Sequence, residues 1–287
     1  MQSLRECIED AAQNKRALGH FNFSNLETLR AIVDAARAVG VPIIAGLSEG
    51  ERGFVGLAQA VALVRSFREE YEHPIFLNAD HSYSFDAVKE AIDVGFDSVI
   101  FDGAELSFEE NTATAKKCVA YARECGRDII VEGELGFIGK ASQVLKKIPD
   151  GVKISAEFLT KPEDAARFVK ATGIDIFAPA VGNMHGMLTG GVDPAIDTLR
   201  VRAIREVAGV SLVLHGASGN SAEDIRTAIE AGIAVVHINT ELRVAYKAGL
   251  MRGLQENQDE IAPYKYLKEP SRAVQKVVEE KLQIFNT

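Results

Sequence analysis

Short continuous runs of apolar residues recur along the chain, and six of the eight runs begin within a few residues of a glycine. Glycine is preferred just past the end of a helix, where the backbone turns left-handed. Because the runs are continuous rather than alternating, they are typical of parallel strands buried on both faces. The predicted strands occupy 17–22, 40–45, 73–78, 95–101, 126–131, 173–178, 209–214 and 232–238.

Helical patterns lie between these runs. Helices are predicted to begin at Ser24, Thr160 and Ser221, since each is followed three residues later by an acidic residue, as in a capping box. Gly232 is expected to end the third helix. We also expect a helix over 2–13 that closes one end of the fold.

Eight strands alternating with helices over about 250 residues predict an α/β fold, a (β/α)8 TIM barrel. The same pattern predicts a C-terminal helical extension over 259–287 and a single domain over 1–287. A doubly wound open sheet is the alternative fold. The phosphate-binding glycine motifs that nucleotide-binding sheets carry, GxGxxG and GxxxxGK[ST], do not follow the first strand.

The composition narrows the choice of partners. The formal net charge is −9 and no basic block stands out, which argues against nucleic acid and anionic membranes. It does not exclude phosphorylated small molecules, because backbone N–H groups bind anions on acidic proteins. No apolar run approaches the roughly 20 residues of a membrane helix.

The cysteines and the N-terminus indicate the cellular compartment of the protein. Cys7, Cys118 and Cys125 are an odd set without a CxxC motif, which favours free thiols in a reducing compartment. The first residues lack the basic start and apolar stretch of a signal peptide. We therefore expect a cytoplasmic protein.

Three of the six histidines, His81, His185 and His215, stand at or just past the ends of predicted strands. In a barrel the active site lies at the carboxyl ends of the strands. Imidazole is the usual nitrogen ligand of zinc, and a catalytic zinc takes three protein ligands and leaves one position open. The pattern therefore predicts one metal held by three strand ends.

Other polar residues crowd the same ends, and each has a structural alternative. Asp80 is either a catalytic group or the N-cap of the next helix. Glu132 and Glu134 share one side of their strand by alternation, so that face is either functional or simply solvated. The segment 215–219, His-Gly-Ala-Ser-Gly, is either a plain turn or a loop whose N–H groups cradle a phosphate.

Several of these motifs together resemble a known family, the class II, zinc-dependent fructose-bisphosphate and tagatose-bisphosphate aldolases. The resemblance covers nearly the whole chain and is carried by Phe21–Asn22, Asn25–Glu27, Ser48–Gly50, Ala79–His81, Val131–Gly136, Val181–Gly186, Leu214–Gly219 and Asn239–Arg243.

The resemblance implies roles for individual residues. Asp80 would be the acid/base acting on the C4 hydroxyl, and Asp102 and Glu134 would serve a second cation position. The zinc ligands it implies are His81, His185 and His215. The substrate phosphate site it implies comprises Gly186, Gly216, Ser218, Asn239 and Thr240, with Ser48 as a further candidate. The family typically forms homodimers or larger homo-oligomers such as homotetramers.

The chain departs from the family pattern at three places. Ser142 stands where the family has a mobile loop glutamate, so Asp150 or a more distant acid replaces it, or proton exchange at C3 is slow. His237 replaces an asparagine, and this imidazole lines the pocket, replaces a hydrogen bond to the substrate, or adds a fourth metal contact. The arginine that meets the distal phosphate is missing, and Lys265 and Arg272 are candidate substitutes.

The expected activity is therefore the reversible aldol cleavage of a ketose 1,6-bisphosphate. Fructose 1,6-bisphosphate would give dihydroxyacetone phosphate and glyceraldehyde 3-phosphate, with zinc stabilising negative charge as a Lewis acid. Tagatose bisphosphate, another phosphoketose, and a non-catalytic phosphosugar-binding role are the alternatives. A Schiff-base aldolase is disfavoured because no lysine ends a strand, and a zinc hydrolase because the first strand has only His20 and no His-x-His.

Overall fold

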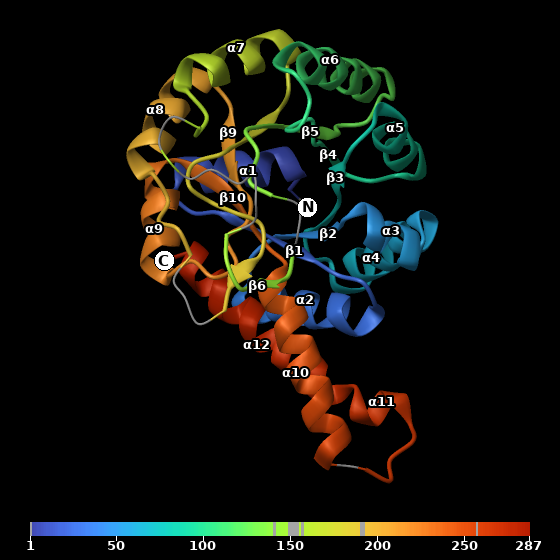
Figure 1. The fold of residues 1–287 in the computed structure, drawn as a ribbon. Coiled ribbons are helices and arrows are strands. Elements are labelled where there is room, and N and C mark those ends of the chain that lie inside the picture. Colours follow the sequence, from blue (N-terminus) through green and yellow to red (C-terminus); the bar gives the residue numbers. More distant parts are fainter. Residues whose placement is uncertain (1, 140–141, 149–154, 156–157, 190–192, 257) are drawn as a thin grey trace.

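Eight parallel strands form a closed barrel in the computed structural model, which describes residues 2–139, 142–148, 155, 158–189, 193–256 and 258–287. Around the barrel the strands follow the order β1, β10, β9, β7, β5, β4, β3 and β2. Helices cross between successive strands on the outside (Figure 1). The predicted (β/α)8 barrel is confirmed. The strands are β1 (Leu18–Asn22), β2 (Ile43–Leu47), β3 (Ile75–Ser82), β4 (Ser98–Phe101), β5 (Ile130–Leu135), β7 (Ile176–Pro179), β9 (Ser211–Leu214) and β10 (Ile233–Ile238).

The outer helices begin largely at residues whose side chains satisfy the first backbone N–H groups. They are α2 (Leu26–Val39), α3 (Glu49–Val55), α4 (Leu57–Tyr71), α5 (Phe85–Val94), α6 (Phe108–Glu124), α7 (Pro162–Thr172), α8 (Thr198–Ala208) and α9 (Ala222–Ala231). None of the described helices is long and apolar enough to cross a membrane.

Two of the three predicted helix starts are wrong. Ser221 caps α9 and Gly232 ends it, as expected. The cap of α2 is Asn25 rather than Ser24. The Thr160 hydroxyl does not cap α7, because it donates to the carbonyl of Leu135 and accepts from the N–H of Ala180. Because this hydroxyl is hydrogen-bonded to the barrel backbone, it cannot cap the helix, and α7 begins after it.

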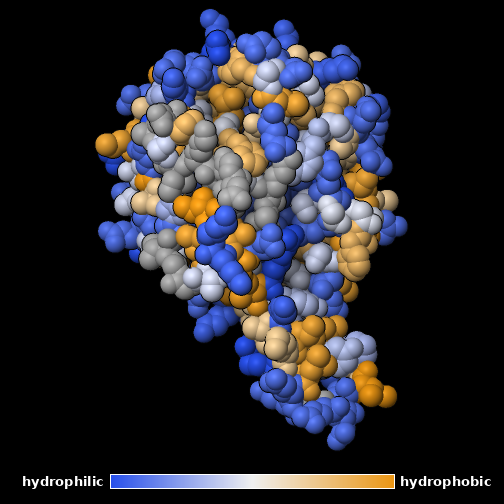
Figure 2. All heavy atoms as spheres, viewed as in Figure 1, coloured by the Kyte–Doolittle hydropathy of each residue, from blue (hydrophilic) through white to orange (hydrophobic). Residues whose placement is uncertain are grey.

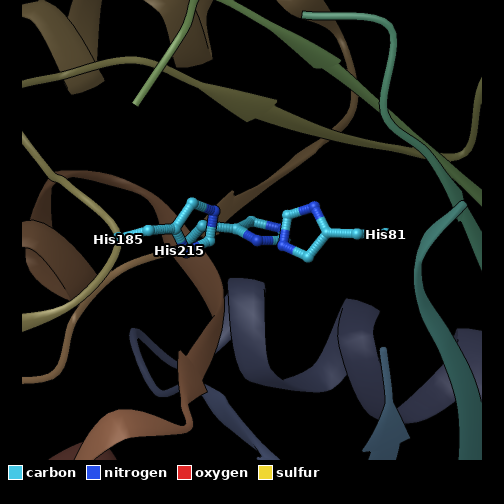
Figure 3. A group of neighbouring side chains, drawn as sticks. All are labelled: His81, His185 and His215. Atoms are coloured by element: carbon cyan, nitrogen blue, oxygen red, sulfur yellow. The ribbon is translucent and has the colours of Figure 1, made fainter. Parts of the chain in front are cut away.

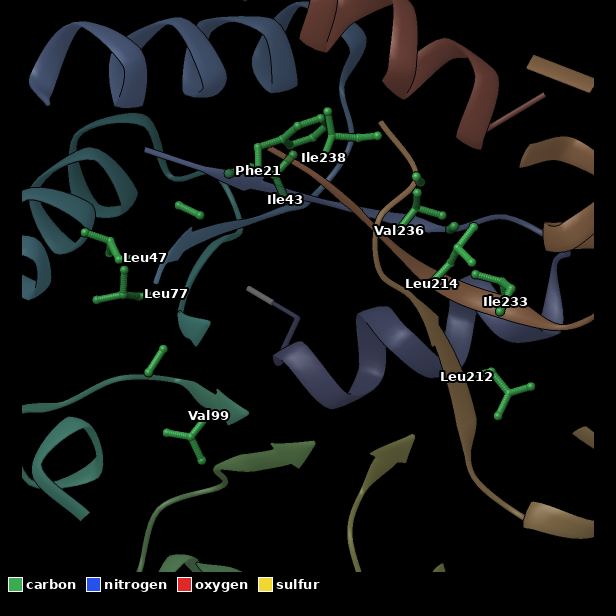
Figure 4. Close-up of a cluster of buried hydrophobic side chains, with 14 of the residues drawn as sticks. Phe21, Ile43, Leu47, Leu77, Val99, Leu212, Leu214, Ile233, Val236 and Ile238 are labelled. Carbon is green, nitrogen blue, oxygen red and sulfur yellow. The ribbon is translucent and has the colours of Figure 1, made fainter. Parts of the chain in front are cut away.

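The continuous apolar runs have a simple cause in the barrel. Successive side chains of a strand point to opposite faces, and both faces are covered here. The outward side chains pack under the helices (Figure 4). The inward apolar side chains fill the barrel toward the amino ends of the strands. Helix α1 (Leu4–Gln13) closes that end with its own buried apolar face, as predicted.

The C-terminal extension is also helical, as predicted. Helices α10 (Thr240–Glu256) and α11 (Pro263–Tyr266) form an arm that projects away from the barrel (Figure 1). Helix α12 (Lys268–Phe285) returns along α10 and packs against α2. Two short strands that the sequence did not predict, β6 (Val144–Leu145) and β8 (Met187–Leu188), join the loops after β5 and β7.

Candidate functional site

Three imidazoles meet at the carboxyl end of the barrel. His81 belongs to β3, His215 directly follows β9, and His185 lies in the loop after β7. Each offers a nitrogen, and these nitrogens lie within 4.8 Å of one another. The three rings point toward a common space (Figure 3). The structure thus brings together the three histidines that the sequence singled out.

The backbone of β3 is irregular where it carries Asp80 and His81. Neighbouring residues of a regular strand point to opposite faces, so only one of the two would reach the barrel mouth. Here the register against β4 shifts between Ala79 and Ser82, and His81 has a positive φ of 45°. Such a backbone is uncommon outside glycine and tends to occur at functional sites. The bulge lets both side chains enter the site.

Two carboxylates hold the His81 ring. Its Nδ1 lies 3.0 Å from both Asp102 Oδ2 and Glu134 Oε1, which leaves Nε2 available to a metal. Burial works to lower the pKa of His81, but the charges of Glu134 and Asp80 outweigh it and raise that pKa well above its usual value. Burial raises the pKa of Glu134 to about 8.

His215 is held by a different carboxylate. Its Nε2 lies 2.6 Å from Glu132 Oε1, and its Nδ1 is buried without a hydrogen-bond partner among the described residues. Burial lowers the pKa of His215 to about 3, so the ring is neutral. Burial likewise holds the pKa of His185 well below its usual value. Neutral imidazole is the form that binds metals.

This donor set fits zinc. Ligands of a tetrahedral zinc stand about 2.0–2.1 Å from the metal, and so about 3.4 Å apart. The nitrogens of His81, His185 and His215 lie within 4.8 Å of one another, and the Nδ1 of His215, unpartnered among the described residues, is an orphaned atom that a metal would satisfy. Carboxylates on the other ring nitrogens are the usual second layer of a histidine zinc site.

Asp80 is buried beside the histidines. Its Oδ2 accepts a hydrogen bond from Asn22 Nδ2 at 2.8 Å, and its Oδ1 lies 3.6 Å from His81 Nε2. Burial alone would raise the pKa of Asp80, but the neighbouring imidazoles, His81 first, hold it well below the usual value. Ser84 caps the next helix, so the N-cap interpretation of Asp80 is wrong.

The glycine-rich segments line the same inner pocket, which has a volume of about 20 Å³. Gly216 has a φ of +63°, and a Cβ there would lie 2.2 Å from the carbonyl oxygen of Met184. Only glycine fits this turn. The remaining residues of the predicted phosphate site that line this pocket are Gly186, Ser218, Asn239 and Thr240.

An outer pocket of about 230 Å³ adjoins the inner one. Asp80, His81, His185 and Asn239 line both pockets. Ser48, the further candidate of the phosphate site, lines only the outer pocket. Ser142 lines both pockets, whereas Asp150 falls outside the described residues.

The two residues that were candidates to replace the family's arginine at the distal phosphate lie outside both pockets. Lys265 pairs with Glu260 and Arg272 with Glu269 on the C-terminal helices, and neither lines the inner or the outer pocket. Among the described residues, Arg243 is the arginine that lines the outer pocket. Sequence reasoning missed it, although it follows Asn239 by four residues, one helical turn, which is a usable signal.

Arg243 is connected to Asp80 through Glu51 and Asn22. Its guanidinium donates to Glu51 Oε1 at 2.6 Å and to the carbonyl of Ser142 at 3.0 Å. Asn22 donates to both Glu51 and Asp80 at 2.8 Å. The sequence analysis assigned no role to Asn22 or Glu51. Glu132 and Glu134 are both buried, so the interpretation of a solvated face is wrong.

Comparison with known proteins agrees with this geometry. The family model described as "Fructose-bisphosphate aldolase class-II" matches residues 2–287. Fructose-bisphosphate aldolase from Staphylococcus aureus (strain Mu50) is 35% identical over 288 residues, covering 99% of this chain and 97% of that protein. The same identity and coverage hold for fructose-bisphosphate aldolase from Staphylococcus epidermidis (strain ATCC 12228).

Solved structures agree as well. The crystal structure of the YdjI aldolase from Escherichia coli K12 is 32% identical, has a TM-score of 0.81, and is matched over 99% of this chain and 96% of that chain. Fructose-bisphosphate aldolase from Campylobacter jejuni, at 20% identity and a TM-score of 0.82, is matched over 99% of this chain and 95% of that one and shares the fold. The chain therefore belongs to the class II fructose-bisphosphate aldolase family, a family of generally metal-dependent lyases.

Proposed function

We propose that this protein catalyses the zinc-dependent, reversible aldol cleavage of fructose 1,6-bisphosphate to dihydroxyacetone phosphate and glyceraldehyde 3-phosphate. The observation that carries the proposal is the convergence of His81, His185 and His215 within 4.8 Å beside the buried carboxylate of Asp80. The names of the Staphylococcus relatives support the substrate. Zinc held by these imidazoles would supply Lewis-acid stabilisation of the negative charge that develops on the ketone half.

Asp80 takes the proton of the C4 hydroxyl as the C3–C4 bond breaks, and returns it in the condensation direction. The neighbouring imidazoles hold the pKa of Asp80 well below its usual value, so the group is an ionised carboxylate with a free acceptor oxygen. Asn22 fixes one of its oxygens by a 2.8 Å hydrogen bond. A positioned general base of this kind contributes about 10²–10⁴-fold to the rate.

Each of the two pockets receives a different phosphate of the substrate. The N–H groups around Gly216, with the hydroxyls of Ser218 and Thr240, receive the phosphate of the dihydroxyacetone half. Ser48 and Arg243 in the outer pocket receive the phosphate of the aldehyde half. A guanidinium has five N–H donors, so Arg243 keeps donors for a phosphate while it is held by Glu51 and Ser142.

A second cation is also part of the proposal. Asp102 and Glu134, whose carboxylate oxygens lie within 4.8 Å of each other beside His81, are candidates to hold that cation.

A homo-oligomer is also part of the proposal. The projecting arm exposes apolar side chains (Figure 2), namely Val244, Met251, Leu254, Ile261 and Tyr264. We propose that a second copy of the chain covers them, in the cytoplasm, as a homodimer or half of a homotetramer.

One observation favours a second candidate function, a phosphosugar-binding protein without turnover. Ser142, whose side chain is no base at neutral pH, occupies the place of the expected loop glutamate. Such a protein would bind the sugar phosphate but release no triose.

Coupled assays on purified protein separate the two. We expect cleavage of fructose 1,6-bisphosphate that disappears after complete chelation of the metal and returns with added zinc. Tagatose bisphosphate and the corresponding monophosphates, assayed in parallel, define the substrate. Full cleavage by metal-free protein would contradict the zinc mechanism, and binding without cleavage at one zinc per chain would support the binding role.

A further inference from the structure

His237 lies in a column of three imidazoles that the strand register creates. His20 on β1 and His237 on β10 are register partners, and Val236 pairs with Leu214, the residue before His215. The His20 and His237 rings are parallel, with centroids 3.6 Å apart and planes 6° apart. The His215 ring lies 4.0 Å from His237 on its other side.

The far end of the column is fixed by polar and steric contacts. His20 Nε2 lies 3.0 Å from Asn78 Oδ1, and Asn78 Nδ2 donates to Ser98 at 2.8 Å, so His20 is the donor in its own contact. A Cβ on Gly46 would lie 2.1 Å from Cε1 of His20. Strand β2 therefore leaves a space that the His20 ring fills, and the column is held in place behind His237.

The parallel pair His20 and His237 is not arranged to hold a second metal. His20, Asp80 and His237 do offer ligand atoms within 4.8 Å of one another. The lone pair of an imidazole nitrogen lies in the plane of its ring. Two parallel rings 3.6 Å apart therefore direct their lone pairs along parallel lines rather than toward one ion 2.0–2.1 Å from both.

The polar contact left to His237 is with Asp80. Its Nδ1 lies 3.5 Å from Asp80 Oδ1, an oxygen that has no hydrogen bond among the described residues. His81 Nε2, the nitrogen available to zinc, lies 3.6 Å from the same oxygen, so a cation on that nitrogen would attract the carboxylate. Contacts of catalytic groups are commonly long in the absence of substrate and shorten in the complex.

We propose that His237 is a positioning residue that holds Asp80 Oδ1 away from His81, so that the carboxylate faces the C4 hydroxyl. Asn22 holds Oδ2 and His237 holds Oδ1, and this two-point hold stops the carboxylate from rotating toward the metal ligand. The proposal rests on the proposed aldolase function. It assigns His237 an action on the acid/base rather than on the metal or on the substrate.

Two substitutions separate the donor from the stacked ring. His237→Phe keeps a ring in the column and removes the donor, whereas His237→Asn keeps a donor at the δ position and removes the ring. We expect kcat to fall about 10- to 100-fold in His237→Phe, less than the roughly 10²–10⁴-fold contribution of the general base itself, with zinc content and KM retained. We expect kcat of His237→Asn to exceed that of His237→Phe at least 10-fold. Equal kcat in the two variants, or a loss of zinc in His237→Phe, would overturn the proposal.

A double-mutant cycle and crystal structures complete the test. If His237 acts through Asp80, His237→Phe costs no further turnover in an Asp80→Asn background, whereas additive losses refute the proposal. In the crystal, His237→Phe should show the Asp80 carboxylate rotated toward His81, and an unmoved carboxylate refutes the proposal. This structural readout does not need turnover. A zinc-loaded wild type that cleaves no phosphoketose would therefore refute the proposed function, whereas the crystal structures would still test the role of His237.

Discussion

Glu132 Oε1 lies 2.6 Å from Nε2 of His215, so the carboxylate holds the ring by one nitrogen and turns the other into the site. This contact sets the orientation of a proposed zinc ligand from the strand two places away in the barrel. Its removal tests the metal site without touching a ligand.

Glu132→Gln should weaken zinc binding about 10- to 100-fold, the usual effect of losing a carboxylate behind a metal-bound histidine. The amide keeps the size of the side chain and replaces one of its two oxygens with an NH2 group. Competition with a chromophoric chelator measures the affinity. Glu280→Gln on α12 is a matched exposed control. Equal zinc affinity in wild type and Glu132→Gln would show that Glu132 does not support a ligand.

Asp80→Asn should lower kcat by about 10²–10⁴-fold, because the amide cannot accept the C4 hydroxyl proton. Zinc content should stay at the wild-type level, since Asp80 is not among the proposed ligands. Coupled steady-state assays together with elemental analysis give both quantities. Loss of zinc in this variant would instead make Asp80 a ligand.

The barrel was predictable from the sequence because the same strand and helix pattern repeats along the chain. Each strand is buried on both faces and most of the helices between strands end near a glycine, so the same signal occurs along the whole chain. Helix starts were less predictable. The hydroxyl of Thr160 has the spacing of a cap, and only the folded barrel shows that Leu135 and Ala180 use it instead.

The site was predictable in its residue types and not in its contacts. His81, His185 and His215 stand at strand ends, which a sequence shows. The positive φ that turns His81 into the site, and the carboxylates that contact His81 and His215, depend on register between distant strands. Arg243 was missed because its partner Glu51 is 192 residues away in the sequence.

Arg243→Ala should raise KM for fructose 1,6-bisphosphate, with a loss of about 10- to 100-fold in kcat/KM, the range of a charge-assisted hydrogen bond. The ketose 1-phosphate has no distal phosphate, so its kcat/KM should change much less. Arg272→Ala, an exposed ion-paired arginine on α12, is the control. An equal loss for both substrates would mean that Arg243 acts only on the structure of the loop.

Phe285→Ala should destabilise the fold by about 3–5 kcal/mol, the usual cost of emptying a buried aromatic site. Phe285 is fully buried at the end of α12, and its ring centroid lies 6.3 Å from that of Phe21 on β1. Urea unfolding monitored by circular dichroism gives the free energy of unfolding. A change below 1 kcal/mol would show that α12 is not part of the cooperative core.

The exposed apolar residues of the arm should keep two chains together. Ile261 is 88% exposed and Met251 is 54% exposed, and a glutamate at each would place two charges in the proposed contact between copies. The double variant Met251→Glu, Ile261→Glu should therefore shift the mass in sedimentation equilibrium from a dimer or tetramer toward the monomer. Leu199→Glu, at an exposed apolar site on α8 outside the arm, should leave the mass unchanged. A wild-type protein that sediments as a monomer, or a double variant of unchanged mass, would remove the arm as the contact, because burial of these side chains against a second copy is the only stabilisation the proposal assigns to it.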